Sequence, residues 1–133
     1  MNTAVTIENP ALSTPFIRDS DVAELADWSK AIAALADASA KPLKPTMVPP
    51  RSMARGDGFW LRSLCAVSPS GEYMGCKLIA ASPKIKRASY LISLFDQRTM
   101  QLAALVDGNR ITDIRTAATA IVAVNAANPE GAL

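Results

Sequence analysis

Histidine is absent from the 133 residues of this chain, and cysteine occurs only twice. The lack of histidine removes the commonest general base and the commonest metal ligand together. The two cysteines, Cys65 and Cys76, form no CxxC pair and lack the spacing of metal ligands, so no metal site is predicted. We expect both thiols to be reduced and buried as small hydrophobic groups, with a disulfide as the alternative.

Long apolar runs, leader sequences and nucleotide-binding loops are missing as well. No segment reaches the roughly 18 consecutive apolar residues of a membrane helix, and Met1–Ala4 begin no secretory signal. The short sequence Gly56–Gly58 is too little for a phosphate-binding loop, and no serine lies in a nucleophile elbow. These absences favour a cytoplasmic protein without a membrane partner.

Positive charge is concentrated in the middle of the chain. Residues 1–40 hold two basic and six acidic side chains, whereas residues 41–98 hold ten basic and three acidic ones. A basic region of this kind attracts either nucleic acid or a small anion. Aromatic residues make up only 5% of the chain, and no RNP-like or helix-turn-helix pattern accompanies the charge. We therefore expect a small anionic ligand and no nucleic acid.

The spacing of apolar residues predicts a helical zone at each end of the folded region. The first begins near Arg18–Asp21, where polar residues can cap a helix, and its apolar stripe runs from Val22 to Leu35. We expect this stripe to pack in the core, and a second cap at Asp27 gives the alternative of two helices. The other zone follows Asp107-Gly108 and ends at Asn128-Pro129.

Strands are expected between these two zones. Short runs with strand character occupy Phe59–Val67, Tyr73–Ala80, Ser89–Phe95 and Gln101–Val106. The connections are too short for helical crossovers, so we predict an α+β fold class, with an antiparallel or mixed sheet meander flanked by an N-terminal helical region and a C-terminal helix. Residues 1–15 are expected to form a flexible N-terminal segment, and residues 16–133 a single domain.

One lysine lies where an apolar side chain is expected. Lys77 stands inside the apolar run Met74–Ile79, and on a strand it shares a face with Gly75 and Ile79. A lysine at such a position either extends its ammonium group to solvent or meets an anion.

Two arginines are further candidates for binding an anion. Arg115 lies about one turn into the C-terminal helical zone, where free N–H groups and the helix dipole favour anions. A surface salt bridge to Asp113 or Asp107 is the alternative for Arg115. Arg51 follows two prolines, and most arginines at such strand edges are simply solvated.

Several of these segments resemble the ornithine cyclodeaminase/mu-crystallin family. The resemblance rests on the strand G-x-K-L-I, the DG turn and the helix start T-x-x-R-T-A-A, which occur in this order within Met74–Ile79, Leu94–Asp96, Leu105–Gly108 and Ile111–Ala118. It covers the chain from Phe16 to Leu133. It implies the substrate-binding and dimerisation half of enzymes that use NAD or NADP on amino or imino acids, such as ornithine cyclodeaminase, alanine dehydrogenase and ketimine reductases.

The resemblance also implies roles for individual residues. Lys77 and Arg115 would bind the substrate carboxylate, Arg51 matches the family's first substrate arginine, and Thr116 matches a threonine that touches the cofactor phosphates. Lys77 would also assist proton handling, for which burial beside two arginines is favourable because it lowers the pKa of lysine. A homodimer is expected, since a short meander leaves one edge and one apolar face uncovered.

The same resemblance places the family's Gly-rich nucleotide loop and catalytic aspartate after Leu133. We therefore expect a truncated enzyme that is inactive alone and needs a Rossmann-containing part, on the same or a separate chain, to use NAD or NADP. The alternative is a catalytically inactive, stand-alone dimerisation or small-anion-binding module. The loop Ser82–Arg87 is shorter and more basic than is usual in the family, so a cofactor contact there is not expected.

Overall fold

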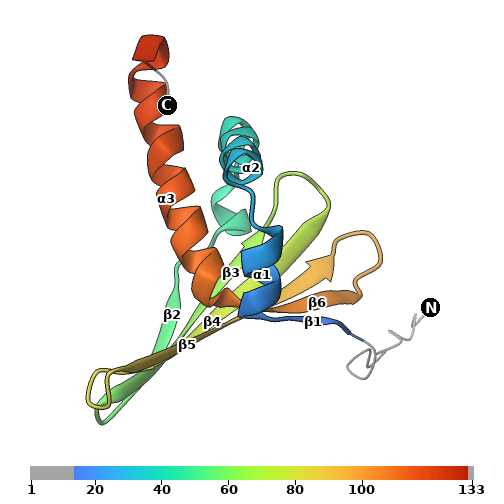
Figure 1. Ribbon diagram of the computed structural model, residues 1–133. Helices are drawn as coiled ribbons and strands as arrows, with labels where there is room; N and C mark the ends of the chain where they lie inside the picture. The colour runs from blue at the N-terminus through green and yellow to red at the C-terminus, as the bar shows by residue number, and fades with distance from the viewer. Residues whose placement is uncertain (1–13, 132–133) are drawn as a thin grey trace, which may run out of the picture.

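The computed structural model describes residues 14–131, which form one six-stranded sheet with helices on one of its faces (Figure 1). The strands are β1 (Phe16–Ile17), β2 (Ser52–Gly56), β3 (Phe59–Val67), β4 (Tyr73–Ser82), β5 (Arg87–Asp96) and β6 (Leu102–Asp107). Their order across the sheet is β1-β6-β5-β4-β3-β2. The α+β class and the mixed sheet are as predicted, and the described residues contain no Rossmann half.

Strands β3 to β6 form the predicted antiparallel meander, and β2 extends it by one strand; each strand is joined to the next by a short turn. Gly58 in the β2–β3 turn has a φ of 77°, a left-handed conformation that glycine adopts without strain. β1 pairs in parallel with β6 and completes the edge, so the sheet is mixed. β1 and β2 were not among the strands expected from the sequence.

The N-terminal helical zone consists of two helices, α1 (Asp19–Leu25) and α2 (Trp28–Ala40). The break comes at Asp27, whose side chain accepts a hydrogen bond from the Lys30 N–H and caps α2. The alternative of two helices is therefore confirmed, and the expectation of one continuous core stripe is wrong. Leu25 and Trp28 flank the break and are 77% and 53% exposed, since the change of direction takes them off a common face.

α3 (Gly108–Ala127) is the long C-terminal helix, and it packs against β5, α1 and α2 (Figure 1). Its N-cap is Asp107, which accepts the N–H of Asn109, and its last turn ends at Asn128 as predicted. Ala118, in the middle of the helix, is completely buried. Two short 3₁₀ turns, η2 (Pro45–Met47) and η3 (Pro129–Gly131), complete the described elements.

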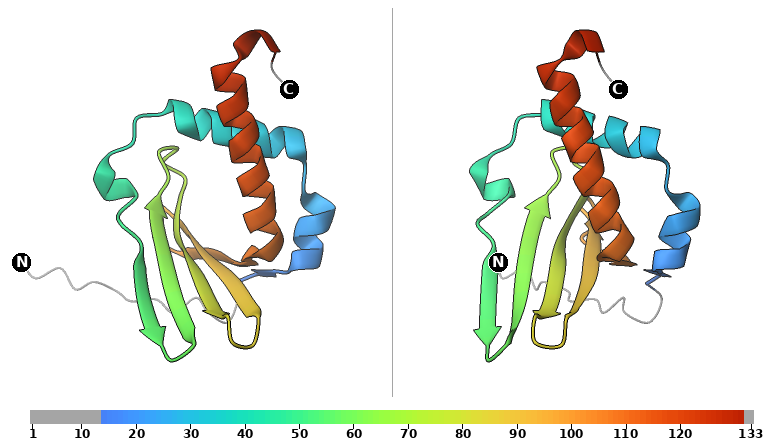
Figure 2. Two further views of the ribbon diagram at one scale, coloured as in Figure 1. Left: turned by 90° about the vertical axis from the view of Figure 1, so that its left-hand side faces the viewer. Right: turned by 60° about the vertical axis from the view of Figure 1, so that its left-hand side comes forward.

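All three α-helices lie on the same side of the sheet, and the opposite side carries no α-helix of residues 14–131 (Figure 2). We call this second side the outer face. Among the described residues only Val22, Ile79, Ala104 and Ala118 are buried hydrophobic residues, and no large side chain is completely buried. A chain of this length normally encloses a larger core. The sheet therefore presents apolar surface that the described part of the chain does not itself cover.

The two cysteines face each other across β3 and β4 on the outer face, where Cys65 pairs in register with Cys76. Both are free thiols, but Cys65 is exposed and Cys76 is only half-buried. The expectation of buried thiols is therefore wrong: both cysteines line a hollow of about 300 Å³ beside Met47, and no α-helix of the described part of the chain packs over them.

The expected flexible segment 1–15 lies almost wholly outside the described residues. At its end the Pro15 carbonyl accepts a hydrogen bond from the Leu105 N–H, which leads the chain into β1. Within residues 14–131, none of the helices combines the length and apolar character that crossing a membrane requires.

Candidate functional site

Lys77 lies in the middle of β4 on the face of the sheet that α3 covers. Its cross-strand neighbours are Leu64 on β3 and Ile92 on β5, so its aliphatic stem is surrounded by apolar side chains. Its ammonium nitrogen donates a hydrogen bond of 2.8 Å to the Thr112 Oγ1 and lies 5.1 Å from the centre of the Tyr90 ring. Lys77 therefore points into the space between the sheet and the start of α3 instead of extending straight to bulk solvent.

Two glycines allow this close arrangement of backbones. A Cβ atom at Gly75 would overlap the carbonyl oxygen of Ser93 on β5, so only glycine fits at the start of the G-x-K-L-I strand. A Cβ at Gly108 would lie 2.9 Å from the Cβ of Tyr90, so glycine here lets the first turn of α3 approach β5. The approach brings Thr112, one turn further along α3, to Lys77.

The Thr112 hydroxyl is oriented by the helix itself. It donates its proton to the Gly108 carbonyl one turn earlier, and this leaves an oxygen lone pair for the Lys77 ammonium group. Lys77 has two further N–H donors for which the described residues supply no acceptor. These donors are free for an anionic ligand.

The two predicted arginines lie close to Lys77. Arg115 follows Thr112 by three positions and therefore stands on the same side of α3. Arg51 immediately precedes β2, whose first residue, Ser52, pairs with Ser63; continuing this register by one residue leads to the row that holds Leu64 and Lys77. Burial lowers the pKa of Lys77 below its ordinary value of 10.5, and the positive charges of Arg115 and then Arg51 lower it further.

These three cations have no carboxylate partner among the described residues. The salt bridges there join Arg18 to Asp21, Lys41 to Asp37, Arg98 to Asp96 and Arg110 to Asp19. The alternative for Arg115, a salt bridge to Asp113 or Asp107, is therefore not formed. Arg51 and Arg115 are both exposed, so their guanidinium groups can reach a ligand without first breaking an ion pair.

A hollow of about 280 Å³ begins beside Lys77 and extends along the sheet toward the β3–β4 turn. Its floor is mostly apolar and includes Leu64, Ala66, Tyr73 and Ile92. Its volume lies near the lower end of the range for small-molecule sites. The arrangement thus offers a group of cations at one end and apolar surface at the other.

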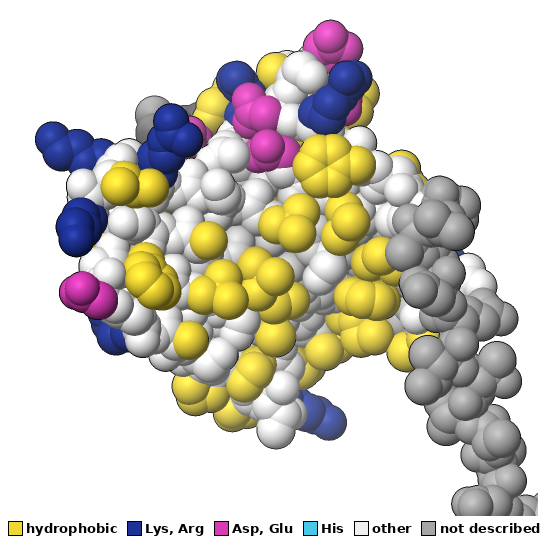
Figure 3. All heavy atoms as spheres, turned by 90° about the horizontal axis from the view of Figure 1, so that it is seen from below, with side chains coloured by type: hydrophobic (Ala, Val, Ile, Leu, Met, Phe, Trp, Pro, Cys, Tyr) yellow, Lys and Arg dark blue, Asp and Glu magenta, His cyan; other side chains and the backbone are white. Residues whose placement is uncertain are grey.

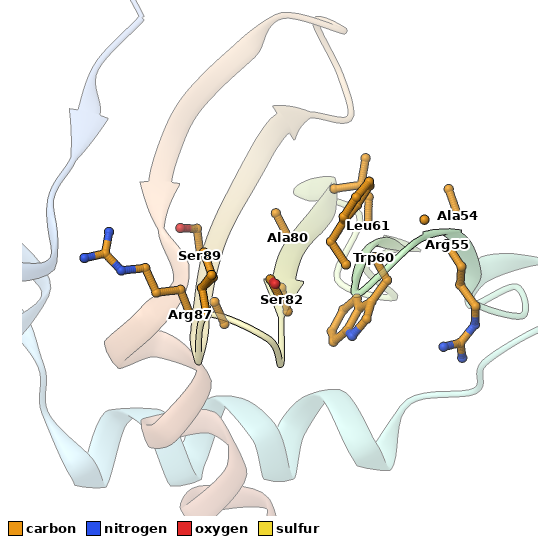
Figure 4. A pocket seen from close by; sticks show the side chains of 13 residues that line it. Ala54, Arg55, Trp60, Leu61, Ala80, Ser82, Arg87 and Ser89 are labelled. Atoms are coloured by element: carbon orange, nitrogen blue, oxygen red, sulfur yellow. The ribbon is translucent and has the colours of Figure 1, made fainter.

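A larger hollow lies on the outer face, near the ends of the β2–β3 and β4–β5 hairpins, and measures about 590 Å³. In Figure 4 the side chain of Leu61 points away from the helices into this region, whereas Trp60 points toward the helix side. Its other lining residues are mainly alanine, serine and Phe59, and its two arginines, Arg55 and Arg87, lie at opposite ends of the hollow in Figure 4 and do not converge. We therefore regard it as a surface for packing and place the candidate site at Lys77.

Thr116, the predicted cofactor contact, is exposed on α3, and its hydroxyl donates to the Thr112 carbonyl. Its proton is thus already used within the helix, and only its oxygen lone pairs remain free. The described residues contain no cluster of three or more metal-ligating side chains.

Tyr90 is the contact of Lys77 that the sequence motifs did not indicate. It belongs to β5, pairs with Ile79 on β4, and contributes an aromatic face next to the ammonium group. The only sequence signal for it is an aromatic residue at the start of a predicted strand, which does not reveal which lysine it will meet.

Comparisons with known proteins support the fold. Neither the protein-family models nor the curated proteins that were compared match the sequence. Among solved structures, a probable ornithine cyclodeaminase from Bordetella pertussis Tohama I has 22% identity and a TM-score of 0.75 over 86% of this chain and 36% of its own. An archaeal alanine dehydrogenase dimer with bound NAD has 21% identity and a TM-score of 0.69, over 81% of this chain and 35% of its own.

A third similar structure is the iminosuccinate reductase of Paracoccus denitrificans in complex with NAD⁺. It has 19% identity and a TM-score of 0.70, over 84% of this chain and 37% of its own. The chain thus spans little more than a third of the length of the enzymes it resembles. The resemblance seen in the sequence motifs is confirmed at the level of the fold: the chain has the fold of a segment of the ornithine cyclodeaminase and alanine dehydrogenase enzymes.

Proposed function

We propose that this chain is the substrate-binding part of an NAD(P)-dependent enzyme acting on a small amino, imino or keto acid. The observation that carries the proposal is the convergence of Lys77, Arg115 and Arg51 without a carboxylate partner. A substrate carboxylate would accept hydrogen bonds from the free donors of Lys77 and from the planar guanidinium of Arg115. Arg51 would add positive charge from the sheet edge.

Lys77 is also suited to a second role, the transfer of a proton near the bound acid. A lysine whose pKa is lowered releases its proton more readily at neutral pH than an ordinary lysine does. The Thr112 hydroxyl holds the ammonium group in place, since the hydroxyl is itself fixed by Gly108. In this proposal Lys77 both binds the acid and acts as its proton donor or acceptor.

The described residues do not form a complete site for a nicotinamide cofactor. They contain neither a parallel nucleotide-binding sheet nor a glycine-rich loop, and the Thr116 hydroxyl has already donated its proton to the helix. We propose that Thr116 contributes only a marginal contact to NAD or NADP and that a Rossmann-containing part or chain supplies the rest. The isolated chain is accordingly expected to bind the acid and to catalyse nothing.

We further propose that two copies of the chain associate through their outer faces. Hydrophobic side chains gather on this face, as Figure 3 shows for the underside of the sheet. Phe59, Leu61 and Leu78 are 60%, 49% and 37% exposed there, an unusual amount of uncovered apolar surface for the two neighbouring strands β3 and β4. A homodimer would cover it.

The carboxylate site is tested by titrating the chain with L-lactate, followed by heteronuclear NMR. We expect Lys77→Met and Arg115→Leu each to weaken binding by about 2–4 kcal/mol, the cost of losing one charged partner of a carboxylate. Arg110→Leu is the matched control, because Arg110 lies on the same helix but pairs with Asp19. Unchanged affinity in both site variants would refute the assignment.

The enzymatic part of the proposal needs a separate assay. The chain is combined with a Rossmann-containing partner and tested for imine reduction with NADH and NADPH. Activity that needs both components and is lost in Lys77→Met supports the enzyme. Carboxylate binding without any activity in the combined sample would instead favour the stand-alone binding module.

A further inference from the structure

A fourth unpaired cation lies on the same face of the sheet as Lys77. Arg62 on β3 pairs with Ile79, which is two residues after Lys77 on β4, so Arg62 occupies the next row across the sheet. Residues two apart on a strand are separated by about 7 Å. Arg62 is half-buried and makes no ion pair within residues 14–131.

The Arg62 side chain is held in place by an aromatic ring. Its guanidinium carbon lies 5.0 Å from the centre of the Trp60 ring, which points toward the helix side of the sheet (Figure 4). Such stacking orients a guanidinium group while leaving the N–H donors along its rim available. No side-chain nitrogen of the described residues is buried without a partner, so the nitrogens of Arg62 remain accessible.

Together these residues make the helix side of the sheet strongly positive. Arg51, Arg62, Lys77 and Arg115 come from three strand regions and a helix, and the described residues supply no carboxylate to pair with any of them. Bringing like charges together without counter-ions is unfavourable, and a ligand of opposite charge relieves it. A single carboxylate held by Lys77 and Arg115 would leave Arg62 uncompensated.

We propose that the acid bound by this chain carries a second carboxylate and that Arg62 binds it. The substrate class is then a short amino, imino or keto dicarboxylic acid, with the first carboxylate at Lys77 and Arg115. Arg62 and Lys77 lie on adjacent strands and are offset by two positions, a separation that the two carboxylates of a short dicarboxylic acid can span. The inference rests on the proposed function, because it assumes that the first carboxylate binds at Lys77.

The apolar hollow beside Lys77 is the competing place for the substrate side chain. It extends toward Tyr73 and the β3–β4 turn and does not include Arg62. An acid with an aliphatic side chain would fill this hollow and leave Arg62 without a role. The charge of four neighbouring cations favours the dicarboxylate.

The test compares L-malate with L-lactate, which differ only in the second carboxylate. Both are titrated into the chain and followed by heteronuclear NMR, with inorganic phosphate as a third ligand. We expect L-malate to bind about 10-fold more tightly than L-lactate, as for one added charged hydrogen bond. In Arg62→Gln this preference should fall to less than about threefold while L-lactate affinity stays the same.

Two further variants make the result specific. Arg62→Lys keeps the charge and should retain part of the preference, which distinguishes a binding role from a folding defect. Arg55→Gln is the control, because Arg55 pairs with Trp60 one row further from Lys77, is exposed and also carries one positive charge. It should leave the preference intact, whereas an equal loss there would show a general charge effect and overturn the inference.

The remaining outcomes separate the inference from the proposed function. One outcome is that L-lactate binds in a Lys77-dependent way and as tightly as L-malate. That result would overturn the dicarboxylate inference but would leave the carboxylate site at Lys77 supported. Phosphate that binds as tightly as L-malate and loses as much affinity in Arg62→Gln overturns it in favour of a phosphate site. Failure of every ligand to bind overturns the proposed function itself.

Discussion

Lys77 lies in an apolar environment close to two positive charges, and both features affect its pKa. Burial and the charges of Arg115 and Arg51 lower its pKa in the folded chain below 10.5. Between the lowered value and 10.5, the unfolded chain holds more protons than the folded one, so this residue makes the folding free energy more favourable as pH rises. At lower pH Lys77 is charged in both the folded and the unfolded chain, and its charge makes folding less favourable. The same charge is the one that would bind a carboxylate.

Carboxylate binding has the opposite dependence on pH. The acid is held by the charged form of Lys77, so its affinity should fall as pH rises through the lowered pKa, earlier than for an ordinary lysine. An NMR titration of the Lys77 side chain should give a pKa below 10.5, and Arg115→Leu should raise that value because one repelling charge is gone. Arg110→Leu should leave it unchanged, since Asp19 already neutralises Arg110. A titration at or above 10.5 would contradict the clustering.

The sequence indicates these residues only in part. The position of Lys77 among apolar residues can be seen directly, because alternation along a strand shows which face it takes. Its neighbours Arg51 and Arg62 are distant in sequence, and only the register of β2 on β3 and of β3 on β4 brings them to the same face. Register depends on how several strands fit together, so the sequence pattern of any one strand does not specify it.

At the scale of elements, β3 was predicted with its observed bounds because turns punctuate both of its ends. β2 was missed because the short edge strand Ser52–Gly56 has little alternation of its own and is defined by pairing with β3. β1 has only two residues and exists through its contact with β6. Strands that depend on a partner carry the weakest signal in their own sequence.

The turn between β5 and β6 is stabilised by one carboxylate. Asp96 accepts hydrogen bonds from the backbone N–H groups of Arg98 and Thr99 at 2.7 and 3.0 Å, and its side chain also pairs with the Arg98 side chain. The Arg98 side chain first, and then these two backbone groups, lower the pKa of Asp96 from 3.8 to about 2. The folded turn therefore stabilises the charged form of Asp96.

We expect the stability that Asp96 contributes to be fully present above pH 3.8 and to be lost as pH falls toward about 2. The unfolded carboxyl group takes up its proton first on acidification, which favours unfolding. Asp96→Asn should lower the melting temperature at neutral pH and remove this part of the acid dependence in thermal scans monitored by circular dichroism. Glu24→Gln is the control, because Glu24 makes no hydrogen bond or ion pair among the described residues. Identical acid dependence in wild type and Asp96→Asn would refute the role of Asp96.

At the scale of the whole molecule, the two faces of the sheet differ in the side chains they present. The helix side carries the cations and the candidate site, whereas the outer face carries apolar side chains and the larger hollow (Figures 3 and 4). The helix side and the outer face share the same strands, because the neighbouring residues Lys77 and Leu78 of β4 point to opposite faces. Association through the outer face would therefore stiffen the strands that position Lys77 without obstructing the site.

Dimerisation is tested by placing a charge in the larger hollow of the outer face. Leu61→Asp should convert a dimer to a monomer in analytical ultracentrifugation at micromolar concentration, because burying an unpaired carboxylate costs at least about 2–3 kcal/mol of association free energy. Leu43→Asp is the matched control: Leu43 is 51% exposed, close to the 49% of Leu61, but lies in the loop after α2. A wild-type monomer, or a dimer that survives Leu61→Asp, would show that the apolar outer face has another occupant. The unchanged dimer of Leu43→Asp would show that the effect depends on the face and not on the added charge.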